Sequence, residues 1–97
     1  MGIHGGLNET SVFMHLRPDL VDLSRAERKV PEALADNEHV KFGGSVAFGW
    51  LSNDFDDAGY IGDPTGANAE RGAELFNHAV ERIGEQMAEI REFNFGR

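Results

Sequence analysis

The sequence contains no cysteine, which excludes two kinds of protein at once. Without thiols, the chain cannot be stabilised by disulfides or bind a metal through thiolates. It also lacks any run of about 18 apolar residues, so no segment is predicted to cross a membrane. Its first six residues carry neither the basic nor the apolar stretch of a signal peptide, and we therefore expect a cytoplasmic protein.

Basic residues are scarce as well. The 97 residues include 9 Lys and Arg against 17 Asp and Glu, which gives a formal net charge of −8. Such a surface repels polyanions, so we expect neither nucleic acid nor an anionic membrane as a partner. A chain of this length buries only about 60% of its unfolded surface, so its own core is small.

Glycine is abundant, with 12 residues, and it marks the predicted turns. Residues 1–8 are predicted to form a loop, and Asn8 is predicted to cap a short helix over residues 10–16. That helix should end before Pro18, because a residue that precedes proline avoids the helical conformation. Residues 24–40 are polar and mixed in charge, which indicates a surface connection with at most a helical turn.

The segment from Phe42 to Leu51 alternates apolar and small residues. This pattern is typical of a strand or of an extended loop that covers a site. Trp50 within it either shields a small-molecule site or packs against its neighbours, and the sequence leaves both interpretations open. The acidic stretch over residues 54–57 lacks the spacing of a calcium loop, so we interpret it as a solvated turn. Residues 62–66 carry a strong turn signal.

Residues 68–93 are predicted to form one long amphipathic helix. Apolar residues recur there at steps of three and four, which places them on one helix face: Ala69, Gly72, Phe76, Ala79, Val80, Ile83, Met87 and Ile90. A helix with such a face needs a partner surface, and the rest of the chain offers only one weak strand. We therefore interpret residues 1–97 as a single partial domain, one piece of a larger α/β unit.

Chemistry is concentrated in the segment His-Gly-Gly-Leu-Asn-Glu at residues 4–9. The glycines Gly5 and Gly6 allow the backbone to approach a ligand closely. A histidine at this place can relay a proton or bind a metal, and Glu9 can orient its ring. The plainer interpretation makes His4 a loop residue and Glu9 a favourable first-turn carboxylate. The residues alone leave both interpretations open.

Two separated blocks of the sequence resemble the creatininase family. The first is His-Gly-Gly-Leu-Asn-Glu-Thr-Ser at residues 4–11, followed by Leu-Arg-Pro-Asp-Leu-Val at residues 16–21. The second is Gly-Asp-Pro at residues 62–64, followed by Ala-Glu-Arg-Gly at residues 69–72. Two blocks in the right order are far more specific than one. The resemblance covers nearly the whole chain, and residues 24–45 contribute least to it.

The resemblance implies a fold and a chemistry. It implies the C-terminal portion of a three-layer α/β/α fold, in an enzyme that hydrolyses C–N bonds of amides, often cyclic ones such as creatinine. Two divalent metals, commonly zinc with manganese, would activate a water. The resemblance makes His4 the residue that relays a proton to the leaving nitrogen and Glu9 its support. Independently of the resemblance, the residue types of Gly5, Gly6 and Trp50 make them candidates to lie near the substrate.

The family's metal ligands lie in segments that have no counterpart in this sequence. We therefore expect the chain alone to bind no metal and to be inactive as an isolated polypeptide. The missing N-terminal half would come from a separate chain, or would have been lost by truncation. Expected partners are a small-molecule amide and either further copies, as a homo-oligomer, or the chain that supplies the other half. The alternative is a non-catalytic assembly or regulatory module in which residues 68–93 form the interface.

Overall fold

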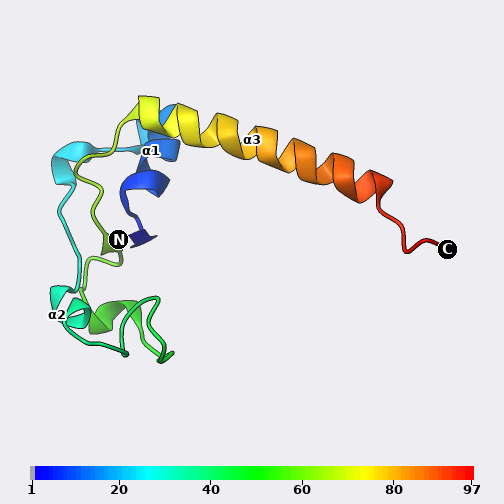
Figure 1. Ribbon diagram of the computed structural model, residues 1–97. Coiled ribbons are helices and arrows are strands. Elements are labelled where there is room, and N and C mark those ends of the chain that lie inside the picture. Colours follow the sequence, from blue (N-terminus) through cyan, green and yellow to red (C-terminus); the bar gives the residue numbers. More distant parts are fainter. Residues whose placement is uncertain (1) are drawn as a thin grey trace.

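The computed structural model describes residues 2–97, and one long helix extends from the rest of the chain (Figure 1). In chain order the regular elements are β1 (Gly2–His4), α1 (Leu7–Leu16), α2 (Glu32–Ala35), β2 (Ile61–Gly62) and α3 (Ala69–Glu92). Three single turns of 3₁₀ helix cover Pro18–Leu20, Leu23–Arg25 and Ser52–Asp54. None of the helices in the described part of the chain is long and apolar enough to cross a membrane.

Helix α1 begins earlier than the sequence predicts. Gly6, with extended backbone angles of φ −84° and ψ −170°, precedes the first turn, so the helix starts at Leu7 rather than at residue 10. Asn8 therefore lies inside the helix, and its prediction as the cap was wrong. The physical reason is that Glu9 reaches back from the first turn and accepts the backbone N–H of Gly5, at 2.6 Å. The predicted end before Pro18 is confirmed, since Arg17 has left the helical conformation (φ −144°).

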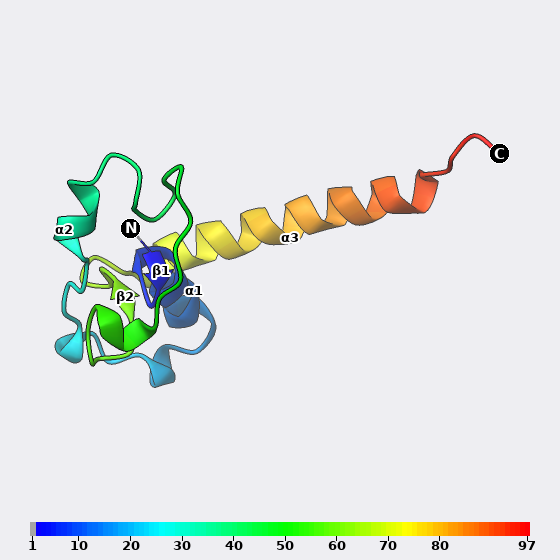
Figure 2. The ribbon, with the colours of Figure 1, turned by 90° about the horizontal axis from the view of Figure 1, so that it is seen from below.

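Strand β1 lies within residues 1–8, which the sequence predicts to be a loop, so that prediction was wrong for Gly2–His4. β1 pairs antiparallel with β2, with Gly2 opposite Gly62 and His4 opposite Ile61 (Figure 2). Gly62 also exchanges two backbone hydrogen bonds of 2.8 Å with Lys29. Strands this short carry no alternating pattern, and their partners are remote in sequence. Only the assembled chain therefore reveals them.

The middle of the chain is mostly irregular. The predicted surface connection over residues 24–40 contains the single turn α2 and little else. No strand is assigned between residues 42 and 51, where Val46 forms only an isolated bridge with Val40, so the strand alternative was wrong. That this loop covers a site stays a prediction. Four aromatic rings gather in and beside this loop with centroids 5.4 to 5.7 Å apart: Phe42, Phe48, Trp50 and Phe55.

The long helix of residues 68–93 is present as α3. Asn68 caps it, because its side-chain Oδ1 accepts the N–H of Arg71 at 2.8 Å. The helix ends at Glu92, and Phe93 is extended. Figures 1 and 2 both show that only the first turns of α3 lie against α1, while the remainder projects away from the other elements.

The contact between α1 and α3 contains much of the buried structure. Ser11 is fully buried, and its hydroxyl donates to the Leu7 carbonyl at 2.6 Å and accepts the N–H of Asn68 at 3.1 Å. Gly72 packs directly on Ser11, where an added Cβ would lie only 1.8 Å from the Ser11 carbonyl oxygen. Ile61, with 1% of its surface exposed, is the largest buried apolar side chain nearby. The second turn of α1 is therefore packed closely against the first turn of α3.

Candidate active site

The segment between β1 and α1 places the residues that the sequence singles out. β1 ends at His4, and Gly5 and Gly6 turn the chain into the helix. Gly5 has a φ of +65°, a conformation that side chains disfavour. A Cβ there would also approach the Cβ of Tyr60 to 3.0 Å. The turn thus depends on glycine at residue 5, whereas the role of Gly5 and Gly6 beside a substrate stays a prediction.

His4 and Glu9 are brought together across this turn. One carboxylate oxygen of Glu9, Oε2, accepts the Gly5 N–H, and the other, Oε1, lies 3.6 Å from Nδ1 of His4. That distance suits an ion pair with a protonated imidazole and is too long for a strong hydrogen bond. A carboxylate on the Nδ1 side leaves Nε2 as the ring atom that can give or take a proton. Both side chains remain accessible, with 66% and 47% of their surfaces exposed.

A cleft of about 330 Å³ opens beside Glu9, and His4 is not among the residues that line it. Its walls are Gly2, Gly6, Leu7, Asn8, Glu9 and Arg71. The volume falls at the lower end of the range, about 300–1,000 Å³, that small-molecule sites occupy. Glu9 and Arg71 place opposite charges on its walls, so the cleft suits a polar ligand better than an apolar one.

Trp50 lies in the aromatic group of the middle loop. Its ring is 5.4 Å from that of Phe42 and 5.7 Å from that of Phe55, in edge-on arrangements. It retains 39% of its surface and is not among the residues that line the cleft beside Glu9. The structure therefore gives Trp50 a packing role, and its contact with a substrate stays a prediction.

The donor set of the described residues does not fit a metal ion. No three His, Cys, Asp or Glu side chains of residues 2–97 come close enough together to hold one. His15 packs against Phe76 in a tilted arrangement with ring centroids 5.7 Å apart, and the Nδ1 atom of His39 lies 3.0 Å from the Ser45 hydroxyl. His4 and Glu9 form a pair without a third ligand. We consequently derive no catalytic step through a metal.

Two residues near the site were not identified from the sequence. Nε of Arg71 donates to Oδ1 of Asn8 at 2.8 Å, next to Glu9 in the chain. Tyr60 packs against Gly5, and its hydroxyl donates to the Glu27 carbonyl at 2.8 Å. The place of Arg71 in the second sequence block was a usable signal. Nothing local to Tyr60 points to its contact.

Charged turns hold the backbone around β2. The hydroxyl and then the N–H of Thr65 donate to Asp63, at 2.5 and 3.0 Å, and these bonds lower the pKa of that carboxyl, with a smaller contribution from Arg28. Hydrogen bonds to Glu27 and then to Asp56, at 3.0 and 3.2 Å, raise the pKa of Lys29. The Asp63 carboxylate and the Lys29 ammonium group therefore stay charged around neutral pH. Their hydrogen bonds and ion pairs stabilise the segments on either side of β2.

Comparison with known proteins identifies the family to which the sequence is similar and a solved structure with a similar fold. The sequence model of the creatininase family, described as creatinine amidohydrolase, matches residues 1–87. No curated protein matches the chain. Among solved structures, that of a candidate creatinine amidohydrolase from Bacteroides fragilis NCTC 9343 is similar, with a TM-score of 0.70 at 24% sequence identity. The alignment covers 99% of this chain and 37% of that one, so this chain spans little more than a third of the solved protein's length.

Proposed function

This chain belongs to the creatininase family, and from that membership we propose that it supplies the proton-relaying part of an amidohydrolase that acts on non-peptide C–N bonds. The observation that carries the proposal is the pairing of His4 with Glu9, which itself lines a cleft of ligand size. The proposed substrates are small amides, cyclic ones included.

The proposed chemistry of this chain is the transfer of one proton. Hydrolysis adds water to the amide carbon and breaks the C–N bond, and the nitrogen leaves readily only if it gains a proton. Nε2 of His4 would donate that proton. Glu9, on the Nδ1 side of the ring, would hold the direction of the imidazole. Its second oxygen is bound to Gly5 N–H, which limits its movement.

The family is generally metal-dependent, and the proposal includes divalent metals such as zinc and manganese, which supply an activated water when bound. Residues 2–97 contain no group of side chains suited to bind such a metal. The side chains that bind the metals would therefore come from residues outside this range or from a partner chain. The three-layer α/β/α architecture belongs to the same proposal, and the acidic composition supports a cytoplasmic location. The 97-residue chain by itself is then expected to hydrolyse amides weakly or not at all.

The test uses the protein in the assembly that it forms in its own cells. We would purify it through a C-terminal tag with the polypeptides that accompany it, measure its zinc and manganese content, and assay creatinine and other cyclic amides. His4→Ala should lower kcat at least about 100-fold, because a positioned general acid contributes that much. His39→Ala, a control histidine that contacts Ser45 rather than Glu9, should leave kcat unchanged. Full activity of His4→Ala would refute the proposal.

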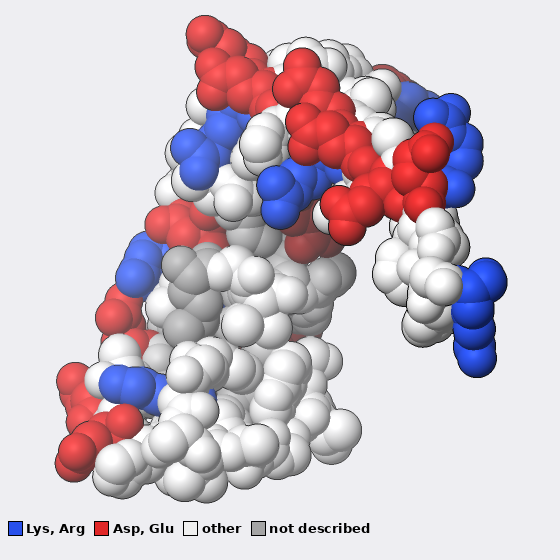
Figure 3. All heavy atoms as spheres, turned by 45° about the vertical axis from the view of Figure 1, so that its right-hand side comes forward, with Lys and Arg blue, Asp and Glu red and all other residues white. Residues whose placement is uncertain are grey.

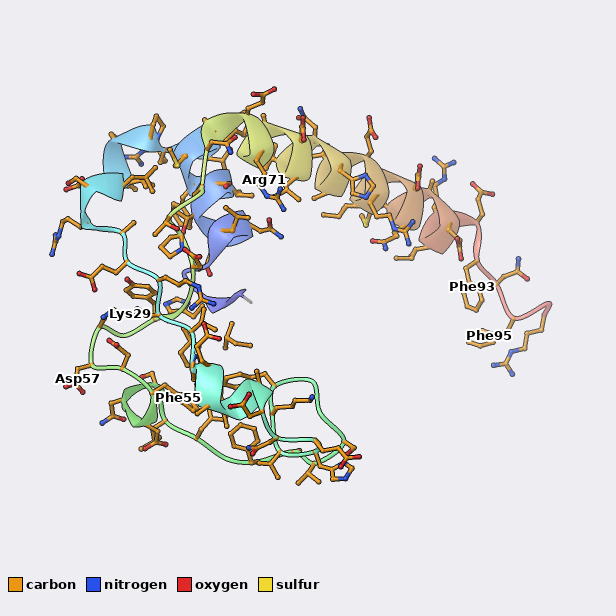
Figure 4. All side chains as sticks on the ribbon, turned by 60° about the vertical axis from the view of Figure 1, so that its left-hand side comes forward. Lys29, Phe55, Asp57, Arg71, Phe93 and Phe95 are labelled. Carbon is orange, nitrogen blue, oxygen red and sulfur yellow. The ribbon has the colours of Figure 1, made fainter. Side chains whose placement is uncertain are left out.

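A second candidate function is a non-catalytic assembly or regulatory module. It is favoured by the apolar side chains that α3 leaves open beyond its contact with α1. Their exposed fractions are 54% for Val80, 57% for Ile83, 63% for Met87 and 69% for Ile90. Figure 4 shows Phe93 and Phe95 beyond the far end of this helix, away from the other elements. A module of this kind would form a homo-oligomer and would tolerate His4→Ala.

A further inference from the structure

We propose that Arg71 and Asn8 are positioning residues that set the direction of Glu9 and, through it, of His4. This inference rests on the proposed function, because it concerns how the His4–Glu9 pair is held. It assigns a role to the hydrogen bond between Arg71 and Asn8, which joins the first turn of α3 to the first turn of α1.

The contact connects segments that are remote in sequence. Nε of Arg71, in the first turn of α3, donates to Oδ1 of Asn8 at 2.8 Å across 63 residues of chain. Figure 4 shows Arg71 at the start of α3, where that helix lies beside α1. Asn8 is the second residue of α1 and directly precedes Glu9. The bond therefore acts on the same helical turn that carries the carboxylate.

A second contact between the helices fixes the rotation of α1 about its axis. The backbone N–H of Asn68 donates to the buried Ser11 hydroxyl at 3.1 Å, and Gly72 packs on the Ser11 backbone. Asn8 and Ser11 are three residues apart and so share one face of α1. Two ties on one face prevent the helix from rotating about its axis. Glu9, about 100° further round the helix from Asn8, is thereby directed toward Gly5 and His4.

The Arg71–Asn8 hydrogen bond can orient Glu9 but contributes little to the stability of the fold. Arg71 and Asn8 are exposed, and a hydrogen bond between exposed side chains adds little to the free energy of unfolding. The close packing of Gly72 on Ser11 should keep the helices together without it. Arg71 also lines the same cleft as Glu9. Loss of the bond is therefore expected to loosen Glu9 while the fold persists.

The Gly5 amide reports on this geometry directly, because its N–H donates to Glu9 at 2.6 Å. We would measure its hydrogen exchange by NMR on the purified ¹⁵N-labelled protein, in Arg71→Ala, Asn8→Ala and the double variant. Glu9→Gln serves as the reference for a weakened acceptor. Arg82→Ala is the matched control, since it removes another exposed arginine of α3 outside the contact.

Each single variant is expected to speed Gly5 exchange about tenfold, the scale on which outer supporting residues act in other sites. The double variant should exchange no faster than either single one, because both remove the same bond. Arg82→Ala should match the wild type. Unchanged exchange in Arg71→Ala, multiplied effects in the double variant, or loss of helix content by circular dichroism in Arg71→Ala would each overturn the proposal.

Kinetics of the native assembly separate this inference from the proposed function. Arg71→Ala is expected to lower kcat about tenfold, because it disturbs the proton donor, and to raise KM as well, because Arg71 also lines the cleft. An inactive His4→Ala beside a fully active Arg71→Ala would leave the proposed function standing and refute the positioning role. An active His4→Ala would refute the function, and the Gly5 exchange would then decide on the Arg71–Asn8 contact by itself.

Discussion

Gly5 shows how one residue determines the geometry of the candidate site. It turns the chain from β1 into α1 at a φ of +65°, and its N–H is the donor that holds Glu9. A side chain there would meet Tyr60, with its Cβ 3.0 Å from the Tyr60 Cβ. The residue thus couples a backbone requirement to the orientation of a proposed functional group.

Gly5→Ala is expected to destabilise the protein by about 1–2 kcal/mol, the cost of the left-handed conformation for a residue with a Cβ. Urea unfolding would measure this change in the free energy of unfolding. Gly49→Ala is the control, because its φ is not positive and an added Cβ meets no atom within 4 Å. Equal stabilities of the two variants would contradict the argument.

The turn after β2 provides a prediction about pH. Because Thr65 lowers the pKa of Asp63 in the folded protein, the charged carboxylate stabilises the fold above its ordinary pKa of about 3.9. This contribution should disappear as the pH falls through the lower folded pKa. The melting temperature of the wild type should therefore exceed that of Asp63→Asn near neutral pH, and the two melting temperatures should converge in acid. A difference in melting temperature that stays constant over this range would refute the prediction.

At the scale of elements, α3 contains two glycines in different surroundings. A Cβ at Gly72 would lie 1.8 Å from the Ser11 carbonyl oxygen and 3.0 Å from the His15 Cβ, so the helices would have to separate. A Cβ at Gly84 meets nothing within 4 Å. The same residue type is therefore required at one position and merely tolerated at the other.

Alanine substitutions should separate these two cases. Gly72→Ala is expected to destabilise the protein by about 1–3 kcal/mol, because overpacking outweighs the gain in helix propensity. Gly84→Ala should stabilise α3 by up to about 1 kcal/mol. Thermal unfolding followed by circular dichroism would compare both with the wild type. A loss of stability at Gly84 would show that this face of α3 is tightly covered.

On the scale of the whole molecule, the described chain is unusually open. Its radius of gyration is 17.7 Å, whereas a compact domain of this length has about 12–13 Å. Its accessible surface is 7416 Å², against about 5,500 Å² for a compact protein of the same mass. Figure 3 shows acidic side chains with fewer basic ones along α3, and below them a large uncharged area bordered on its left by charged side chains. The excess of accessible surface over that of a compact protein is available for contacts with other chains.

The open face of α3 predicts self-association of the purified protein. Ile83→Asp should weaken association at least about tenfold, because it places a charge where an apolar side chain would be buried. Asn77→Asp adds the same charge about 120° away around the helix and should have little effect. Light scattering on a size-exclusion peak would measure both. A monodisperse wild-type monomer that melts cooperatively would contradict this prediction.

The sequence by itself determined the elements that depend on neighbouring residues. The apolar repeat between residues 69 and 90 predicted α3, and Pro18 predicted the end of α1, because helix propensity and proline sterics act within a few residues. The two motif blocks identified the family, which the match over residues 1–87 confirms. The same blocks named His4 and Glu9, although their catalytic roles stay predictions.

Only the tertiary structure decided which remote segments meet. The pairing of β1 with β2, the packing of Gly72 on Ser11 and the bond from Arg71 to Asn8 each join residues about 57 to 63 positions apart. Such contacts form when the chain buries its few apolar groups, and no local pattern encodes them. The start of α1 was mispredicted for a different reason: its determinant is local, but the N–H of Gly5 reaches Glu9, four residues later, only when the turn after β1 has formed.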